Sequence, residues 1–131
     1  MKIEKNIKEK RLKALIIAAH GSRKKESNFE VASLTERLSQ KATGSFDIVD
    51  HAFLQFAEPL LEHKIEELVQ KGAKKIVVFP FFIASGSHIL VDIPELIKKI
   101  KKTNPNVDFK VTRHLGKIDA IEDIILREVL V

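Results

Sequence analysis

The sequence predicts an α/β domain in which helices cover both faces of a mostly parallel four-stranded sheet. Short apolar runs, typical of buried strands, alternate with longer segments that carry apolar residues at helical spacing. Glycine or proline stands near most of the junctions, where the chain has to turn. The chain has 131 residues, of which 44% are hydrophobic and 31% charged, so we expect one globular domain over residues 1–131.

The first third of the chain predicts a strand, a helix and a second strand. Residues 14–19 (ALIIAA) form a short apolar run that ends at His-Gly-Ser, as a buried strand does. Residues 25–41 carry apolar side chains at intervals of three and four, which is typical of a helix with one buried face. Gly44 ends this helix, and residues 46–54 are the second strand candidate.

Proline and glycine mark the limits of the second predicted helix. Pro59 suits the first turn of a helix, and Gly72 is a typical residue after the last turn. Residues 75–82 then predict the third strand. Pro80 cannot donate a hydrogen bond to a neighbouring strand, so we expect it near the end of this one. The inner side of the second helix consists of Leu61, Ile65 and Leu68.

The last third predicts a helix, a weaker strand and a final helix. Asp92 is a candidate N-cap, which puts Pro94 in the first turn of the third helix. That helix ends at Asn104, residues 107–112 form the fourth strand, and residues 118–129 form the last helix. The expected inner sides are Ile93, Leu96, Ile97 and Ile100 in the third helix, and Ile121, Ile125 and Val129 in the last.

Composition excludes several classes of function. The chain has no cysteine, which excludes a disulfide scaffold, a thiolate zinc site and a cysteine nucleophile. Its net charge of +5 favours an anionic partner, but six of its basic residues lie within residues 1–13. The rest of the chain therefore carries almost no net charge. We therefore interpret residues 1–13 as a basic N-terminal extension and expect no nucleic-acid partner.

A basic start followed by an apolar run has the outline of a signal peptide. Here the run is six residues long and is bounded by Lys13 and His20, which is too short. No stretch approaches the roughly 20 apolar residues of a membrane-spanning helix. The expected location is the cytoplasm, with no membrane partner.

Two histidines fall just after predicted strands. His20 follows the first strand and His88 follows the third. In a flavodoxin-like order these strands are neighbours, so both loops meet at the carboxyl edge of the sheet, where such sheets bind ligands. Two imidazoles are too few for a closed structural site, but they suit an open site for a divalent cobalt, nickel or iron ion. A histidine at a strand end is more often a hydrogen-bonding loop residue, so spacing alone leaves both interpretations open.

Other polar residues fall at the same predicted edge. Gly21 and Ser22 follow His20, and the small residues of segment 85–87 precede His88. Small residues in these two loops let an anionic ligand approach the backbone. Turns favour the same residue types, so a purely structural role is the alternative. Glu58 follows the second strand and serves either as a ligand contact or as a partner of the helix dipole. His51 is interpreted as a residue near this edge and His63 as an exposed helix residue. His114 follows the fourth predicted strand, so it either borders the site or, as is more common, is a loop residue.

Three segments form a recognisable combination. The first is the strand that ends in His-Gly-Ser-Arg at residues 20–23, the second is AFLQFAEP at residues 52–59, and the third is PFFIASGSH at residues 80–88, followed by Asp-Ile-Pro. In this order and in so short a chain they are specific. Together they resemble the small sirohydrochlorin cobaltochelatases, the short class II tetrapyrrole chelatases, from about Leu15 to Ile97.

The resemblance implies a reaction and roles for individual residues. Members of this family insert a divalent metal into sirohydrochlorin and release protons. For this chain it implies Co²⁺ insertion for cobalamin (corrinoid) biosynthesis, with Ni²⁺ or Fe²⁺ as alternatives and no tightly bound cofactor. His20 matches the histidine that binds metal and accepts a pyrrole proton, and His88 matches the second metal ligand. Small members are homodimers. The implied substrate contacts are Glu58, Ile83, Ala84, Ser85, Gly86, Ser87 and His88.

The implied chemistry is consistent with these residues. An imidazole has to be unprotonated to bind metal, so activity should fall in acid. Sirohydrochlorin carries many carboxylates, which a basic protein attracts. The flat macrocycle needs a wide cleft, and we expect Phe82 and Ile83 to line part of it.

Two other functions remain open at this point. A non-catalytic carrier of metal or tetrapyrrole would need the same two histidines. Histidine phosphatases also place His-Gly after a first strand, but they need an arginine directly before that histidine, where this chain has Ala19.

Overall fold

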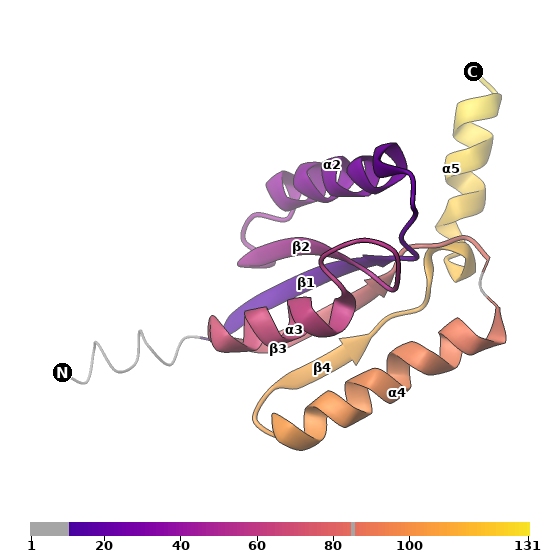
Figure 1. Ribbon diagram of the computed structural model, residues 1–131. Coiled ribbons are helices and arrows are strands. Elements are labelled where there is room, and N and C mark those ends of the chain that lie inside the picture. The colour runs from indigo at the N-terminus through magenta and orange to yellow at the C-terminus, as the bar shows by residue number, and fades with distance from the viewer. Residues whose placement is uncertain (1–10, 85) are drawn as a thin grey trace.

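A four-stranded parallel sheet forms the centre of the protein (Figure 1). The computed structural model describes residues 11–84 and 86–131, except for the side chains of Ser87, His88 and Leu90. The strand order is β2-β1-β3-β4, which confirms the predicted α/β class and the adjacency of the first and third strands. The strands are β1 (Leu12–Ala19), β2 (Ile48–Phe53), β3 (Ala73–Pro80) and β4 (Asp108–Val111).

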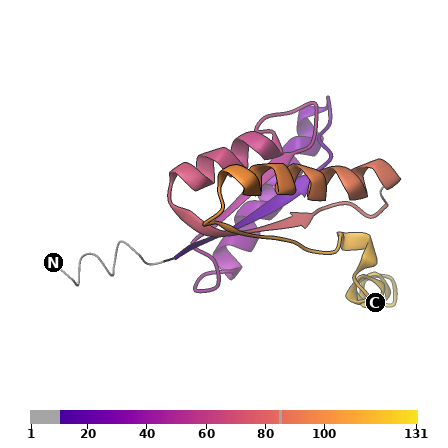
Figure 2. The ribbon, with the colours of Figure 1, turned by 90° about the horizontal axis from the view of Figure 1, so that it is seen from below.

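Helices lie on both faces of the sheet, as predicted. α2 (Lys25–Lys41) covers one face beside β2, while α3 (Leu61–Gln70) and α4 (Ser87–Thr103) cover the other (Figures 1 and 2). A short 3₁₀ turn, η1 (Leu115–Lys117), leads to the last helix, α5 (Ala120–Val129). Within the described part of the chain, no helix is long and apolar enough to cross a membrane. The cytoplasmic location stays a prediction.

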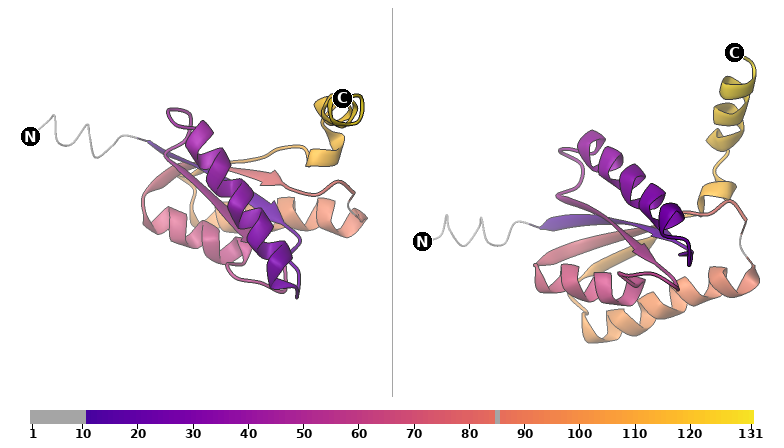
Figure 3. Two further views of the ribbon diagram at one scale, coloured as in Figure 1. Left: turned by 90° about the horizontal axis from the view of Figure 1, so that it is seen from above. Right: turned by 45° about the horizontal axis from the view of Figure 1, so that its top comes forward.

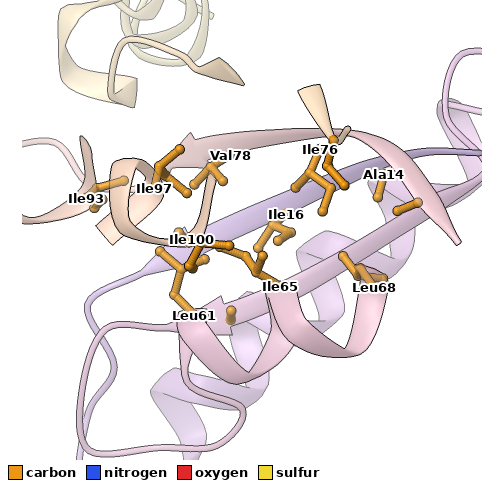
Figure 4. Close-up of a cluster of buried hydrophobic side chains, with 14 of the residues drawn as sticks. Ala14, Ile16, Leu61, Ile65, Leu68, Ile76, Val78, Ile93, Ile97 and Ile100 are labelled. Atoms are coloured by element: carbon orange, nitrogen blue, oxygen red, sulfur yellow. The ribbon is translucent and has the colours of Figure 1, made fainter. Parts of the chain in front are cut away.

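The main core lies between the sheet and the pair α3 and α4. Alternate residues of β1 and β3 point to this side, because successive side chains of a strand face opposite ways. They meet the apolar sides of α3 and α4 that the spacing predicted, and Leu96 packs at the margin. Figure 4 shows this cluster, which includes Ala14, Ile16, Ile76 and Val78 from the strands, Leu61, Ile65 and Leu68 from α3, and Ile93, Ile97 and Ile100 from α4.

The start of α4 was predicted incorrectly. The helix begins at Ser87 rather than after Asp92, and Pro94 lies inside it instead of in its first turn. Ile89 packs against the core one helical turn before Ile93, and this contact extends the apolar side of the helix toward its N-terminus. Packing therefore outweighs the backbone hydrogen bond that a proline inside a helix cannot donate.

The predicted extension also needs a correction at its boundary. β1 begins at Leu12, so residues 12 and 13 belong to the sheet rather than to an extension. Leu12 pairs with Ala73 of β3, and the backbone N–H of Lys13 donates to the Asp47 carboxylate at 2.8 Å. Residues 1–10 lie outside the described part. The prediction that Pro80 ends the third strand is confirmed.

The last helix does not cover the sheet, contrary to the prediction. α5 points away from the carboxyl edge of the sheet (Figures 1 and 3), and none of its residues is buried. Ile125 and Val129, which were expected to face inward, are 54% and 65% exposed. The cause lies in the preceding turn, where the N–H of Gly116 donates to the carbonyl of Phe82 at 3.2 Å. This bond holds η1 at the end of β3, so α5 starts beyond the sheet.

His51 is a partly buried group of β2 rather than a residue of the carboxyl edge. It follows Asp50, which pairs with the buried Lys64 of α3 at 3.2 Å, so His51 faces the opposite side of the sheet, toward α2. Its ring lies against Phe53 with a centroid distance of 5.3 Å. Burial is the main cause that lowers the pKa of His51 from its ordinary value of 6.5; Lys64 adds to this effect and Asp50 opposes it.

We expect the protein to lose stability in mild acid through His51. Because its pKa is lower in the folded state, the unfolded chain takes up the proton first as the pH falls below about 6.5. His51→Gln should therefore show a smaller decrease of the urea midpoint between neutral pH and mild acid than the wild type. His63→Gln, at an exposed histidine of α3, is the matched control and should behave as wild type. An equal decrease in the wild type and His51→Gln would contradict this assignment.

Candidate functional site

His20 lies at the carboxyl edge of the sheet, directly after the central strand β1. Its ring is partly buried and packs on Phe82, with 4.7 Å between ring centroids and 41° between ring planes. Phe82 follows β3, the neighbour of β1, so the sheet itself brings the two rings together. One imidazole is thereby held at the position where open parallel sheets bind ligands.

A second imidazole continues this arrangement. The ring of His114 also lies against Phe82, with 5.6 Å between ring centroids and 25° between ring planes. Phe82 and His114 are only 7% and 8% exposed. We call His20, Phe82 and His114 the imidazole column. The sequence favoured a loop role for His114 over a place at the site, and this missed its burial; its position shortly after the end of β4 was the signal.

A glycine holds the His20 loop close to its neighbour. Gly21 has φ of +90°, and a Cβ atom at this position would overlap the carbonyl oxygen of Gln55. The backbone N–H of Gln55 in turn donates to the carbonyl of His20 at 3.0 Å. The loops after β1 and β2 therefore touch through their backbones, and only glycine fits at position 21.

A second glycine fixes the His114 side of the column. A Cβ atom on Gly116 would overlap the carbonyl oxygen of Ile83. Together with the hydrogen bond from Gly116 to Phe82, this close approach ties η1 to the chain that follows β3. Sequence reasoning assigned no role to Gly116.

The polar residues after His20 stabilise their own loop. The N–H of Ser22 donates to the side-chain oxygen of Asn28 at 2.9 Å, and the Asn28 amide donates back to the Ser22 carbonyl at 2.7 Å. Arg23 lies over the ring of Phe56, 4.6 Å from its centroid. Ser22 thus has the turn role that its residue type predicted, and Arg23 links the loops after β1 and β2.

Glu58 stands at the start of α3. Its carboxylate accepts a hydrogen bond from the N–H of Leu60 at 3.2 Å and lies 3.7 Å from Nδ1 of His63. This is the helix-start role that the sequence left open. The side chain is largely exposed, and its contact with substrate stays a prediction.

The loop between β3 and α4 borders the same edge. Ile83, Ala84 and Gly86 are exposed, and Ser85 lies outside the described residues. Ser87 and His88 form the first turn of α4, while their side chains lie outside the description. The backbone of His88 therefore follows β3 as predicted, and the pairing of its imidazole with His20 stays a prediction. Among the described side chains, no three histidine or acidic residues gather as a metal cluster.

Fold and site together define the class of protein. An open parallel sheet of order 2-1-3-4 carries an imidazole and an aromatic ring at its carboxyl edge, which is the ligand-binding edge of such folds. The chain is thus an α/β protein with a histidine at the edge where such sheets bind ligands. The CbiX family profile matches residues 14–130, and the chain belongs to this family.

Similar proteins carry chelatase names. The chain is 35% identical over 111 residues to a sirohydrochlorin ferrochelatase of Arabidopsis thaliana, a match that covers 85% of this chain and 48% of that protein. It is 31% identical to a sirohydrochlorin cobaltochelatase of Saccharolobus islandicus, with 88% and 91% covered. A solved structure of the sirohydrochlorin chelatase SirB from Bacillus subtilis subspecies spizizenii, in complex with cobalt, matches with a TM-score of 0.75 and 27% identity, covering 91% and 50%.

These comparisons confirm the resemblance that the motifs indicated. The chain is shorter than some of these relatives, since it spans only about half the length of the plant ferrochelatase and of SirB. Their names include both iron and cobalt as the inserted metal.

Proposed function

We propose that this protein inserts a divalent metal into sirohydrochlorin, with Co²⁺ as the first candidate metal and cobalamin biosynthesis as the pathway. The observation that carries the proposal is the partly buried imidazole of His20, held against Phe82 at the carboxyl edge of the central strand. Membership of the CbiX family and relatives named sirohydrochlorin chelatase support it.

The reaction requires a metal ion to enter the macrocycle while two pyrrole N–H protons leave, so the charge balances. A neutral imidazole of His20 binds the ion, with His88 as the second ligand. Once the ion passes to the macrocycle, the imidazole is able to accept one of the protons. Phe82 packs against the His20 ring and restrains it, and exposed Ile83 offers an apolar contact for the flat substrate.

The identity of the metal is the first question for experiment. Relatives named for cobalt and for iron share this fold, and affinities in solution follow the general order of divalent metals rather than the physiological choice. Anaerobic absorbance time courses with sirohydrochlorin and Co²⁺, Ni²⁺ or Fe²⁺ in turn should show the largest acceleration over the protein-free reaction with Co²⁺. A larger acceleration with Fe²⁺ or Ni²⁺ would make that metal, instead of Co²⁺, the substrate metal of this proposal.

We also propose that two copies of the chain pair through α5. Three large apolar residues in its middle, Ile124, Ile125 and Leu126, are more than half exposed, as is Phe29 of α2. Large apolar side chains left exposed together on one helix are typical of an interaction surface. A second copy is the favoured occupant because SirB, which is about twice as long, matches this chain over 50% of its length.

Ile125→Asp should therefore convert a dimer into a monomer without unfolding the protein. The substitution puts a charge on the exposed side of α5, where a partner would bury it. Val91→Asp, at an equally exposed residue of α4, is the control and should stay dimeric. Sedimentation velocity at micromolar concentration measures the difference. A monomeric wild type would contradict the proposed dimer. A dimeric Ile125→Asp variant would show that α5 does not form its interface.

A further inference from the structure

A hollow of about 540 Å³ lies beside the imidazole column, on its His114 side. Its walls are apolar and come from three elements, since Phe82 follows β3, Ile89 and Ile93 belong to α4, and Val111 ends β4. The volume is within the range of small-molecule sites in proteins. Because Phe82 belongs both to this wall and to the column, a ligand in the hollow lies next to the candidate metal site.

The rim of the hollow is basic. Arg113, His114 and Lys117 line it together with Thr112, and none of the acidic residues that the structure describes does. In the described part of the chain, neither Arg113 nor Lys117 has a carboxylate within 4.0 Å. One guanidinium nitrogen of Arg113 donates to the carbonyl of Lys117 at 3.5 Å, which holds the guanidinium over η1 and leaves its other donors available.

This rim is fixed relative to the column. Gly116 lies between the two ends of the rim, and its N–H donates to the carbonyl of Phe82. A side chain at position 116 would overlap Ile83, so the turn is seated directly on the chain after β3. The backbone that carries the basic side chains is therefore fixed beside an apolar wall, which lowers the cost of ordering these side chains around an anion.

We propose that this hollow binds one carboxylated pyrrole ring at the outer edge of the tetrapyrrole. The ring packs on Phe82, Ile89 and Ile93, and its acidic side chains pair with Arg113 and Lys117. This assignment rests on the proposed function, because it takes the macrocycle as substrate. It goes beyond the two metal histidines by naming a site that orients the macrocycle relative to His20.

The chemistry of the hollow favours this ligand over others. Its walls are too apolar for a phosphate or a free metal ion, and its rim is too basic for an uncharged apolar molecule. A flat ring with carboxylate arms satisfies both parts. Arginine binds a carboxylate through two parallel hydrogen bonds, while lysine adds a point charge.

A fragment titration tests the site without any chelatase assay. Porphobilinogen, a single pyrrole with one acetate and one propionate arm, is added to the isotope-labelled protein and followed by NMR. Saturable shifts should appear at Val111, Thr112 and His114 and at the methyl groups of Ile89 and Ile93. The double variant Arg113→Gln/Lys117→Gln should weaken binding at least about tenfold, as expected for lost hydrogen bonds to charged groups. Lys110→Gln removes a cation of β4 that does not line the hollow and should bind as wild type.

The outcomes separate this inference from the proposed function. The inference is overturned when the fragment causes no saturable shift at these residues, or when the double variant binds it as tightly as the wild type. In turnover, the double variant should raise the KM for sirohydrochlorin, whereas Lys110→Gln leaves it unchanged. If the wild type does not accelerate metal insertion, the proposed function fails, but the fragment titration still decides whether the hollow is a site for carboxylated pyrroles.

Discussion

His20→Ala should abolish metal insertion while the protein stays folded. The substitution removes the one described imidazole that lies at the end of the central strand and is open to a ligand. Both metal binding and acceptance of a pyrrole proton are then lost. Loss of a catalytic acid or base alone typically costs at least about 100-fold in rate. The fold should tolerate the change, because the His20 ring is only partly buried.

The measurement is the initial rate of spectral change with sirohydrochlorin and the preferred metal. Circular dichroism and the urea midpoint show whether the variant is folded. His63→Ala removes an exposed histidine of α3 and serves as the matched control, with a rate equal to wild type. A folded His20→Ala protein with the wild-type rate would exclude the mechanism argued above.

Gly21→Ala should have the largest effect on stability of any small substitution at the site. Position 21 has φ of +90°, which costs an alanine about 1–2 kcal/mol. The new methyl group would also overlap the Gln55 carbonyl, and moving the backbone to relieve this overlap costs about 1–3 kcal/mol more. The free energy of unfolding should therefore fall by roughly 2–5 kcal/mol.

Gly44→Ala separates the two causes. Gly44 also has φ of +90°, but a Cβ atom there would meet nothing within 4 Å, so only the backbone term remains. Urea unfolding of both variants measures the difference, which reports the close contact between the loops after β1 and β2. If Gly21→Ala costs no more than Gly44→Ala, these loops do not touch as described.

Periodicity predicted the elements whose packing is local. The predicted limits of the first helix, residues 25–41, coincide with those of α2. Apolar spacing also identified the inner sides of α3 and α4, because each of these helices packs on the adjacent sheet. The parallel sheet followed from the alternation of strands and helices, and the adjacency of β1 and β3 from the flavodoxin-like order expected for such a sheet.

The parts that were missed depend on contacts between distant segments. Nothing near Asp92 in the sequence shows that Ile89 packs into the core and that α4 already starts at Ser87. The apolar side of α5 was expected to pack on the sheet, but none of its residues is buried. The burial of His114 depends on Phe82, 32 positions away in the sequence, and on the close approach of Gly116 to Ile83.

The central claim is that the protein catalyses metal insertion rather than merely carrying its reactants. The most direct test compares the anaerobic rate of Co²⁺ insertion into sirohydrochlorin with catalytic amounts of the wild-type protein against the protein-free rate. Our account predicts many turnovers per protein and a rate proportional to protein concentration. Binding of metal and macrocycle with a rate equal to the protein-free reaction would contradict it and identify a carrier.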